Sequence, residues 1–337
     1  MTETRIRVST GGRLQLGFRY FGSAGSRVFG GVGVGIDQPR TAVSVRPADR
    51  IVCEHDRAKT FANRSVELLS VPGAEVTVEE ELPVHHGYGS GTRLALATYT
   101  AIAEVYGERT AIREAAANLG RGRRSAAGIE TFERGGLALD AGQPSSILRE
   151  GRPWDVPKIL GRFEVPEGWR FLLVTPAIEP GESGSQERHR IRRAIEHAST
   201  ALDARARTAT YEDLLPGIIT KDLDRFGSGI TALDRVTGEA FAQPQEGLHR
   251  ETCGRVLDIL LESAVLTGGG QSSWGPLVYA CTDSNDAERA AQLGQEALRE
   301  VGAQGTVRVV RPAATGRQID AIDGIQTNQG APPNTKE

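Results

Sequence analysis

A run of glycine and hydroxyl residues at 87–92, with the sequence GYGSGT, has the composition of an anion-binding loop. Glycine lets backbone N–H groups approach an anion closely, and a helix that begins here adds the partial positive charge of its N-terminus. Ser90 and Thr92 add hydroxyl groups that can donate to the anion or cap the helix. The run is neither a Walker loop nor a G-x-G-x-x-G fingerprint. A phosphate or diphosphate is the expected ligand, and a plain glycine turn with a helix cap explains the residues equally well.

A second glycine-rich run, GGGQSSWGP at 268–276, is too polar and too rich in glycine to be a minimal turn. We expect a loop here. Trp274 stands between small residues, so its indole could stack on an aromatic ligand. The alternative is a loop that a single core tryptophan fixes in place.

Three arginines within four positions, Arg121, Arg123 and Arg124, could hold a phosphate or carboxylate through forked hydrogen bonds. Taken alone, such a run is more typical of a solvated surface. His85 and His86 precede the first glycine run and could act as general acid, general base or phosphate ligand. Two histidines without further ligands do not indicate a metal site.

Alternation and helical periodicity predict the elements that must position these runs. Four glycines in the first expected strand indicate that another group approaches its backbone closely. A break rich in glycine and proline at 141–166 indicates a domain boundary, and the tail from Thr327 onward is expected to be disordered. Strands are expected at 28–36, 41–45, 76–82, 136–140, 169–175, 277–281 and 306–310. Helices are expected at 56–69, from the first glycine run to 105, and at 111–119, 186–198, 222–241, 251–263 and 286–301.

Composition limits the classes of function. With 337 residues, 39% hydrophobic and 25% charged, the chain can form one large or two medium domains with a substantial core. A net charge of −3 gives no strong field of either sign, so neither nucleic acid nor a membrane is the expected partner. Cys53, Cys253 and Cys281 form no C-x-x-C pair, which predicts reduced, buried thiols. With no apolar leader, this favours the cytoplasm.

The order of these features resembles the GHMP kinase superfamily, which has one glycine-rich loop in each of two domains. The details are most similar to the β-ribofuranosylaminobenzene 5'-phosphate synthases. Three segments carry this resemblance: His85 to Thr92, Arg124 to Gly136 (RSAAGIETFERGG), and Gly270 to Pro276. Arg311-Pro312 also fits, and the similarity extends over about residues 10 to 318.

The resemblance implies an α+β fold with a ribosomal-protein-S5-domain-2-like domain at 1–155, a ferredoxin-like domain at 156–325 and a disordered tail at 326–337. It implies transfer of phosphoribosyl from phosphoribosyl diphosphate to p-aminobenzoate or p-hydroxybenzoate, with loss of carbon dioxide and diphosphate, in methanopterin-type cofactor biosynthesis. Magnesium is the expected cofactor, and a homodimer is compatible with the sequence. The implied catalytic residues are Trp274, Arg124 and Glu130. The implied phosphate ligands are Gly87, Gly89, Ser90, Gly91, Thr92, Gly269, Gly270, Gln271, Ser272 and Ser273.

Two departures keep alternatives open. The family has Arg-Leu-His where this chain has Arg13-Leu14-Gln15, and glutamine cannot accept the proton that histidine could. This leaves a non-catalytic ligand-binding paralogue as one alternative. Glu130 stands where superfamily kinases commonly keep a catalytic aspartate, which leaves an ATP-dependent small-molecule kinase as the other. Trp274 and Pro276 in the second run argue against an ordinary kinase.

Overall fold

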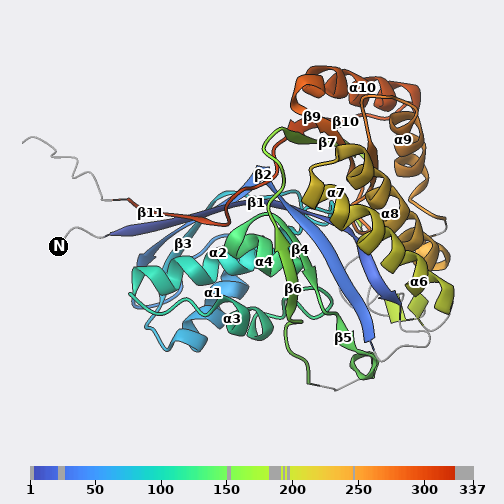
Figure 1. Ribbon diagram of the computed structural model, residues 1–337. Coiled ribbons are helices and arrows are strands. Elements are labelled where there is room, and N and C mark those ends of the chain that lie inside the picture. The colour runs from blue at the N-terminus through green and yellow to red at the C-terminus, as the bar shows by residue number, and fades with distance from the viewer. Residues whose placement is uncertain are drawn as a thin grey trace, which may run out of the picture.

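The computed structural model describes residues 4–21, 27–149, 153–181, 191–192, 194–195, 198–245 and 247–322. Two long antiparallel strands, β1 (Arg5–Phe21) and β2 (Arg27–Pro47), form the centre of the first sheet (Figure 1). Its order is β11-β1-β2-β4-β6, and β3 and β5 pair with other parts of β2. The remaining strands are β3 (Ala74–Glu80), β4 (Leu137–Asp140), β5 (Gln143–Pro144), β6 (Ile159–Phe163) and β11 (Gln318–Ile322).

Four helices pack on the first sheet: α1 (Asp56–Leu69), α2 (Ser90–Val105), α3 (Ile112–Asn118) and α4 (Ala127–Arg134). Helix α2 is buried along most of its length, because its many alanines let β1, β2, α1 and α4 approach it closely. The close approach expected from the strand glycines is found at Gly31, where a Cβ would lie 2.0 Å from Ser125 Oγ. A short 3₁₀ turn (Ser145–Leu148) follows β5.

The second sheet is antiparallel, with the order β10-β7-β9-β8. Helices α9 and α10 cover one of its faces, and α8 packs with the other (Figure 1). The strands are β7 (Trp169–Pro176), β8 (Gly268–Gln271), β9 (Val278–Asp283) and β10 (Gly305–Val310). The helices are α6 (Thr200–Thr208), α7 (Leu215–Thr220), α8 (Leu223–Gln245), α9 (Glu251–Leu261) and α10 (Ala287–Glu300), with a π turn at Ala209–Leu214 and a 3₁₀ turn at Ser284–Asp286.

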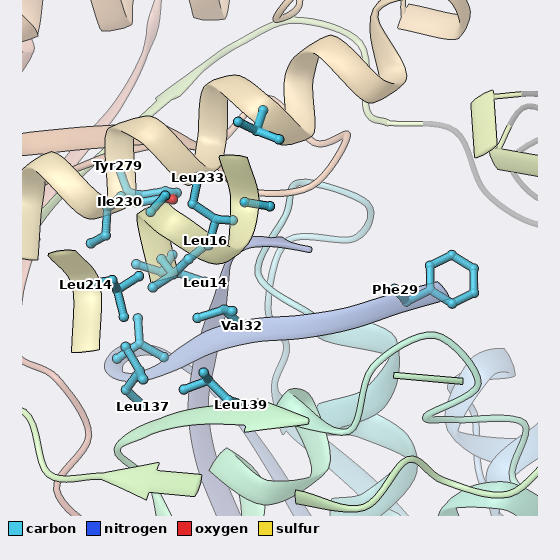
Figure 2. Packing of buried hydrophobic residues seen from close by; sticks show 14 of the residues in the cluster. Leu14, Leu16, Phe29, Val32, Leu137, Leu139, Leu214, Ile230, Leu233 and Tyr279 are labelled. Atoms are coloured by element: carbon cyan, nitrogen blue, oxygen red, sulfur yellow. The ribbon is translucent and has the colours of Figure 1, made fainter. Parts of the chain in front are cut away.

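One hydrophobic cluster joins the two sheets. Leu14 and Leu16 of β1 lie between Val32 of β2 and the α8 residues Ile230 and Leu233 (Figure 2). All five side chains are at most 1% exposed, and each such side chain stabilises the folded state by about 1.5–3 kcal/mol. Side chains alternate along a strand, so burying Leu14 and Leu16 directs Arg13 and Gln15 to the opposite face of β1. Among the described helices, none is long and apolar enough to cross a membrane.

Most of the expected elements are confirmed, and α1 has the predicted bounds. The run at 268–271 was expected as a loop, but it forms β8, because its backbone pairs with β9 in full register. Helix α4, within the arginine-serine segment, was not expected. The helix expected at 186–198 and the tail at 326–337 lie largely or wholly outside the described residues. The boundaries at 155 and 325 stay a prediction, although β6 and β11 join the first sheet.

Candidate active site

A cleft of about 1200 Å³ lies between the two halves of the chain. Its floor comes from β1, and its walls come from the loop before α2, the segment between α3 and α4, helix α8, and the segment 271–275. Both sequence runs singled out for their glycines therefore border one space. Of the expected site residues, the lining includes Arg124, Trp274, Gly87, Gly89, Ser90, Gly91, Thr92, Gln271 and Ser273.

The two runs touch each other through Ser272. Its hydroxyl donates to the Gly87 carbonyl at 2.7 Å and accepts from the backbone N–H of Gln15 at 3.0 Å. Gly275 packs against the preceding peptide, between His86 and Gly87, since a Cβ there would lie 2.3 Å from the Gly87 nitrogen. The side chain of Ser272 is wholly buried and does not line the cleft. Its expected phosphate contact is therefore replaced by a role in joining the two loops.

Helix α2 points its N-terminus into the cleft. Its cap residue Gly89 has φ 73°, the left-handed region in which glycine is favoured. The Gly89 carbonyl accepts from the N–H groups of Thr92 and Arg93, whereas Ser90 and Gly91 begin the helix, where N–H groups have no intrahelical partner. The first turn has no acidic residue, and the nearest atom to a Cβ on Gly89 is 3.7 Å away. The helix end is thus open to an anion.

Arg13 lies beside this helix end and was not predicted as a site residue. Its backbone N–H donates to the Tyr88 carbonyl at 2.9 Å, which fixes β1 against the first glycine loop. Its Nε and Nη1 atoms are buried, and neither has a hydrogen-bond partner among the described residues. Burial and the neighbouring Arg124 lower the pKa of Arg13 to about 10. Behind it, burial and the charge of Arg13 lower the pKa of Arg93 to about 9.

Arg124 is positioned through the residue after it. Ser125 donates to the Asp140 carboxylate at 2.8 Å, and the Ala126 N–H donates to the same oxygen at 2.8 Å. The second oxygen of Asp140 accepts from the Gly142 N–H at 2.8 Å. Burial raises the pKa of Asp140, and these three hydrogen bonds oppose that shift. The carboxylate thus fixes the turn that directs Arg124 to the cleft.

The lining is strongly cationic. It contains eight arginines: Arg13, Arg57, Arg64, Arg121, Arg123, Arg124, Arg149 and Arg192. Asp234 is the only carboxylate in the described lining. Because clefts with low-dielectric walls focus the field of such charges, this cleft attracts polyanions although the chain as a whole is slightly acidic. Sequence reasoning found three of these arginines from their spacing, and the others come from distant segments.

Aromatic side chains also line the cleft. Trp274 meets Phe241 edge to face, with ring centroids 5.6 Å apart, and Phe241 meets Phe18 at 6.2 Å. Phe29 lies 5.7 Å from Phe18. Trp274 is only partly buried, so part of its indole remains available to a ligand ring.

Asp234 is engaged by the protein. Its carboxylate accepts from His249 Nε2 at 2.6 Å and from the Gln271 backbone N–H at 2.9 Å. The Gln271 side chain accepts from the Arg250 N–H and donates to the Ser273 carbonyl, each at 3.0 Å. Gln271 lines the cleft, but these bonds use its amide to shape the second loop.

Three expected ligands of the second run do not line the cleft. Gly269 donates its N–H to Thr231 Oγ1, and a Cβ on Gly270 would lie 2.4 Å from Asp234. Both belong to β8, which packs against α8. With Ser272 buried as described, the expectation that these three residues bind phosphate is corrected: they support the loop from behind.

Glu130 also lies away from the cleft. It is 1% exposed on α4, where it forms an ion pair with Arg134, and Arg113 lies 3.9 Å from its other oxygen. A buried carboxylate requires such partners. The expected catalytic role for Glu130 is therefore corrected to a structural one. His85 lines the cleft, whereas His86 is turned to the Val84 carbonyl.

The comparisons with known proteins agree with this architecture. The family described as GHMP kinases N terminal domain matches residues 56–131. A homoserine kinase from Cytophaga hutchinsonii has a similar structure, with a TM-score of 0.68 at 16% identity over 94% of this chain and 97% of that one. A mevalonate pyrophosphate decarboxylase from Streptococcus pyogenes gives a TM-score of 0.67 at 12% identity over 93% and 98%. These likenesses show the fold.

Curated relatives are similar in sequence over most of the chain. A β-ribofuranosylphenol 5'-phosphate synthase from Methanothermobacter thermautotrophicus is 27% identical over 86% of this chain and 92% of its own length. The synthase of the same name from Archaeoglobus fulgidus is 26% identical over 83% and 88%. The chain thus has the GHMP kinase fold, and residues 56–131 match the GHMP kinases N terminal domain. Over most of its length it is similar to the β-ribofuranosylphenol 5'-phosphate synthases.

Proposed function

We propose that this chain transfers a phosphoribosyl group from phosphoribosyl diphosphate to the ring of a p-substituted benzoate, with release of diphosphate and carbon dioxide. The observation that carries the proposal is one cleft that brings together arginine side chains, the N-terminus of α2 and a cluster of aromatic rings. Eight arginines and the N-terminus of α2 suit the phosphate groups of the donor. Trp274 and Phe241 suit a planar acceptor ring. The relatives' names describe a product of this kind.

In the proposed reaction, the leaving group and the attacking ring lie on opposite sides of one carbon. Diphosphate leaves C1 of the ribose as positive charge develops there, and the ring carbon that bears the carboxylate attacks from the other side. Arg13, Arg124 and the N–H groups of Ser90 and Gly91 would stabilise the departing diphosphate, because fixed donors act strongly in a water-poor site. Trp274 would orient the ring. Loss of carbon dioxide then returns the bonding electron pair to the ring and restores aromaticity.

Magnesium does not fit the protein side of this cleft well. Among the described residues, no group of three or more histidine, cysteine, aspartate or glutamate side chains could hold a metal ion. The one lining carboxylate, Asp234, is engaged by His249 and Gln271. Magnesium usually takes one or two protein carboxylates in addition to substrate phosphates. We therefore assign the neutralisation of the diphosphate to the arginines.

The kinase alternative loses its main support in this chain. A kinase needs a carboxylate close to the acceptor hydroxyl to accept or orient its proton. Glu130, which suggested that role, is buried in an ion pair outside the lining. A non-catalytic paralogue stays an alternative, which turnover by the purified protein would exclude.

The test is a product analysis with carboxyl-labelled acceptors. The purified protein is incubated with phosphoribosyl diphosphate and p-hydroxybenzoate or p-aminobenzoate, and labelled carbon dioxide and diphosphate are measured together. The proposal expects both in equal amounts, and none without the sugar. Diphosphate without carbon dioxide would indicate hydrolysis of the donor or transfer to the acceptor's oxygen or nitrogen. A parallel incubation with ATP and sugar alcohols detects ADP, which would support the kinase.

Three finer points belong to the same proposal. Methanopterin-type cofactor biosynthesis is the expected context. A reduced compartment, the cytoplasm, is expected from three free and buried cysteines. The homodimer remains a prediction, which the molar mass in solution will test.

A further inference from the structure

Gln15 has one orientation of its side-chain amide. Nε2 donates to the Gly17 carbonyl at 2.8 Å and to the Val32 carbonyl at 3.1 Å, which uses both of its hydrogens. The reversed amide would place Oε1 against two carbonyl oxygens, so the hydrogen-bond network excludes it. The backbone N–H of Gln15 donates to Ser272, which fixes the main chain as well. The position of Oε1 is therefore set by the fold.

This fixed oxygen is an acceptor without a donor. Among the described residues, no group donates a hydrogen bond to Gln15 Oε1, although the side chain is only 5% exposed. Gln15 lines the cleft. Oε1 is not among the fully buried atoms without a partner in the described residues, so this acceptor is open to a donor from a ligand in the cleft. The ligand group that Oε1 suits is an uncharged hydroxyl or amine donor.

The place of Gln15 in the cleft selects among the donors of the substrates. Its backbone N–H donates to Ser272, the residue at which the loop before α2 meets the segment that carries Trp274. In the proposed reaction the junction between diphosphate and ring is C1 of the ribose. The hydroxyl attached next to C1 is the 2-hydroxyl. An acceptor here would also assist the chemistry, because a hydrogen bond from the 2-hydroxyl strengthens as positive charge develops at C1.

We infer that Gln15 Oε1 accepts a hydrogen bond from the ribose 2-hydroxyl of the donor substrate, and that Gln15 thereby selects ribosyl over 2-deoxyribosyl donors. The inference rests on the proposed function. No proton is transferred, since an amide oxygen is not a base at neutral pH. Glutamine in place of the family's histidine thus gives this chain an acceptor whose strength does not change between about pH 5 and pH 8, where a histidine would titrate.

The test compares two donors on two proteins. Gln15→Met removes the acceptor at similar length, and kcat/KM is measured with phosphoribosyl diphosphate and with its 2-deoxy analogue. We expect Gln15→Met to lose roughly tenfold or more with the ribosyl donor and less than about twofold with the analogue. The intrinsic reactivity of the deoxy sugar cancels, because each donor is compared between parent and variant. An equal loss with both donors, or no loss with either, would overturn the inference.

Two controls keep the result decisive. Gln245→Met changes another glutamine of the cleft, whose Nε2 also donates to a backbone carbonyl, and should not alter the ratio between the two donors. Gln15→Asn keeps the amide but withdraws the oxygen by one methylene, so it should reproduce the loss if Gln15→Met fails to fold. Turnover by the parent protein is measured first, and this measurement tests the proposed function separately. If the parent does not turn over, calorimetric binding of both donors to parent and variant still decides whether Gln15 contacts the 2-hydroxyl.

Discussion

The Ser272 hydroxyl donates to the Gly87 carbonyl at 2.7 Å and so connects two glycine-rich runs that are 185 residues apart in the chain. The same oxygen accepts from the Gln15 N–H. One small side chain therefore holds the first loop, the second loop and the floor strand β1 at a single point. The geometry of the cleft depends on this point more than on any direct contact of Ser272 with a ligand.

Ser272→Ala should destabilise the protein by about 1–3 kcal/mol, because it leaves the buried Gln15 N–H without a partner. It should also weaken the binding of phosphoribosyl diphosphate, since the loops lose their connection. Chemical unfolding and calorimetry measure the two effects. For stability, Ser273→Ala is the matched control, because the adjacent hydroxyl makes neither contact. An equal loss of stability in both variants would refute the joining role.

Gly89→Val should abolish high-affinity binding of the donor. The left-handed φ of 73° disfavours a β-branched residue, and the new side chain would occupy the open space in front of the α2 N-terminus. Because the backbone strain alone could destabilise the loop, Gly89→Ala serves as a smaller companion change. Binding is followed by titration calorimetry on variants whose helix content is unchanged. A folded Gly89→Val that binds as tightly as the parent would disprove the assignment of the anion to this helix end.

Arg13→Met should stabilise the ligand-free protein. Bound phosphoribosyl diphosphate should then stabilise this variant less than it stabilises the parent. Burial lowers the pKa of Arg13 from 12.5 to about 10, so the folded state disfavours the protonated form by up to about 3 kcal/mol. Because the pKa of Arg13 is lowered in the folded state, the energetic penalty for its charged form is fully present below pH 10 and disappears only as the pH rises above that value. Across pH 6 to 8.5 the effect should therefore be constant.

Melting temperatures with and without phosphoribosyl diphosphate measure both parts of this prediction. The melting temperature of the parent should rise markedly when the donor is added, because an anion supplies the partner that Arg13 lacks among the described residues. Arg170→Met, on a strand away from the cleft, should leave this rise in melting temperature unchanged. If the melting temperature of Arg13→Met rises as much as that of the parent, the anion binds away from Arg13.

The sequence was informative where function depends on local pattern. The first glycine run, the arginine cluster and Trp274 reach the cleft because each is set by a short segment whose backbone or spacing is visible in the sequence. The failures have a different cause. Glu130, Gly270 and Ser272 were implied by the family resemblance, but the pairing of β8 with β9 and the packing of α4 direct them away from the cleft. Only tertiary structure decides such directions.

The residues that sequence reasoning missed are likewise products of tertiary contact. No strand was expected across Arg13, and only the structure shows that β1 places it beside Gly89. Asp234 and His249 lie in and after a helix predicted for its apolar stripe, and their pairing is visible only in space. For Arg13, one signal was present: it alternates with the apolar Leu14 and Leu16, which predicts that it leaves the core.

The comparison of Trp274 with Glu130 separates the synthase from a kinase. Trp274→Ala removes the surface expected to orient the acceptor ring, and a misplaced ring could reduce kcat/KM about a hundredfold. Glu130→Gln should be mild in turnover, because the carboxylate pairs with Arg134 outside the cleft; its effect should appear as lower stability. A kinase would show the reverse order, with the carboxylate as the sensitive group. Both variants are first tested for folding, since Trp274 is partly buried and truncating a core tryptophan can destabilise a protein by about 3–5 kcal/mol. Phe241→Leu provides an intermediate change, because it weakens the edge-to-face support of Trp274 while keeping the indole. Full turnover by folded Trp274→Ala, together with loss of turnover in folded Glu130→Gln, would be incompatible with the proposed reaction.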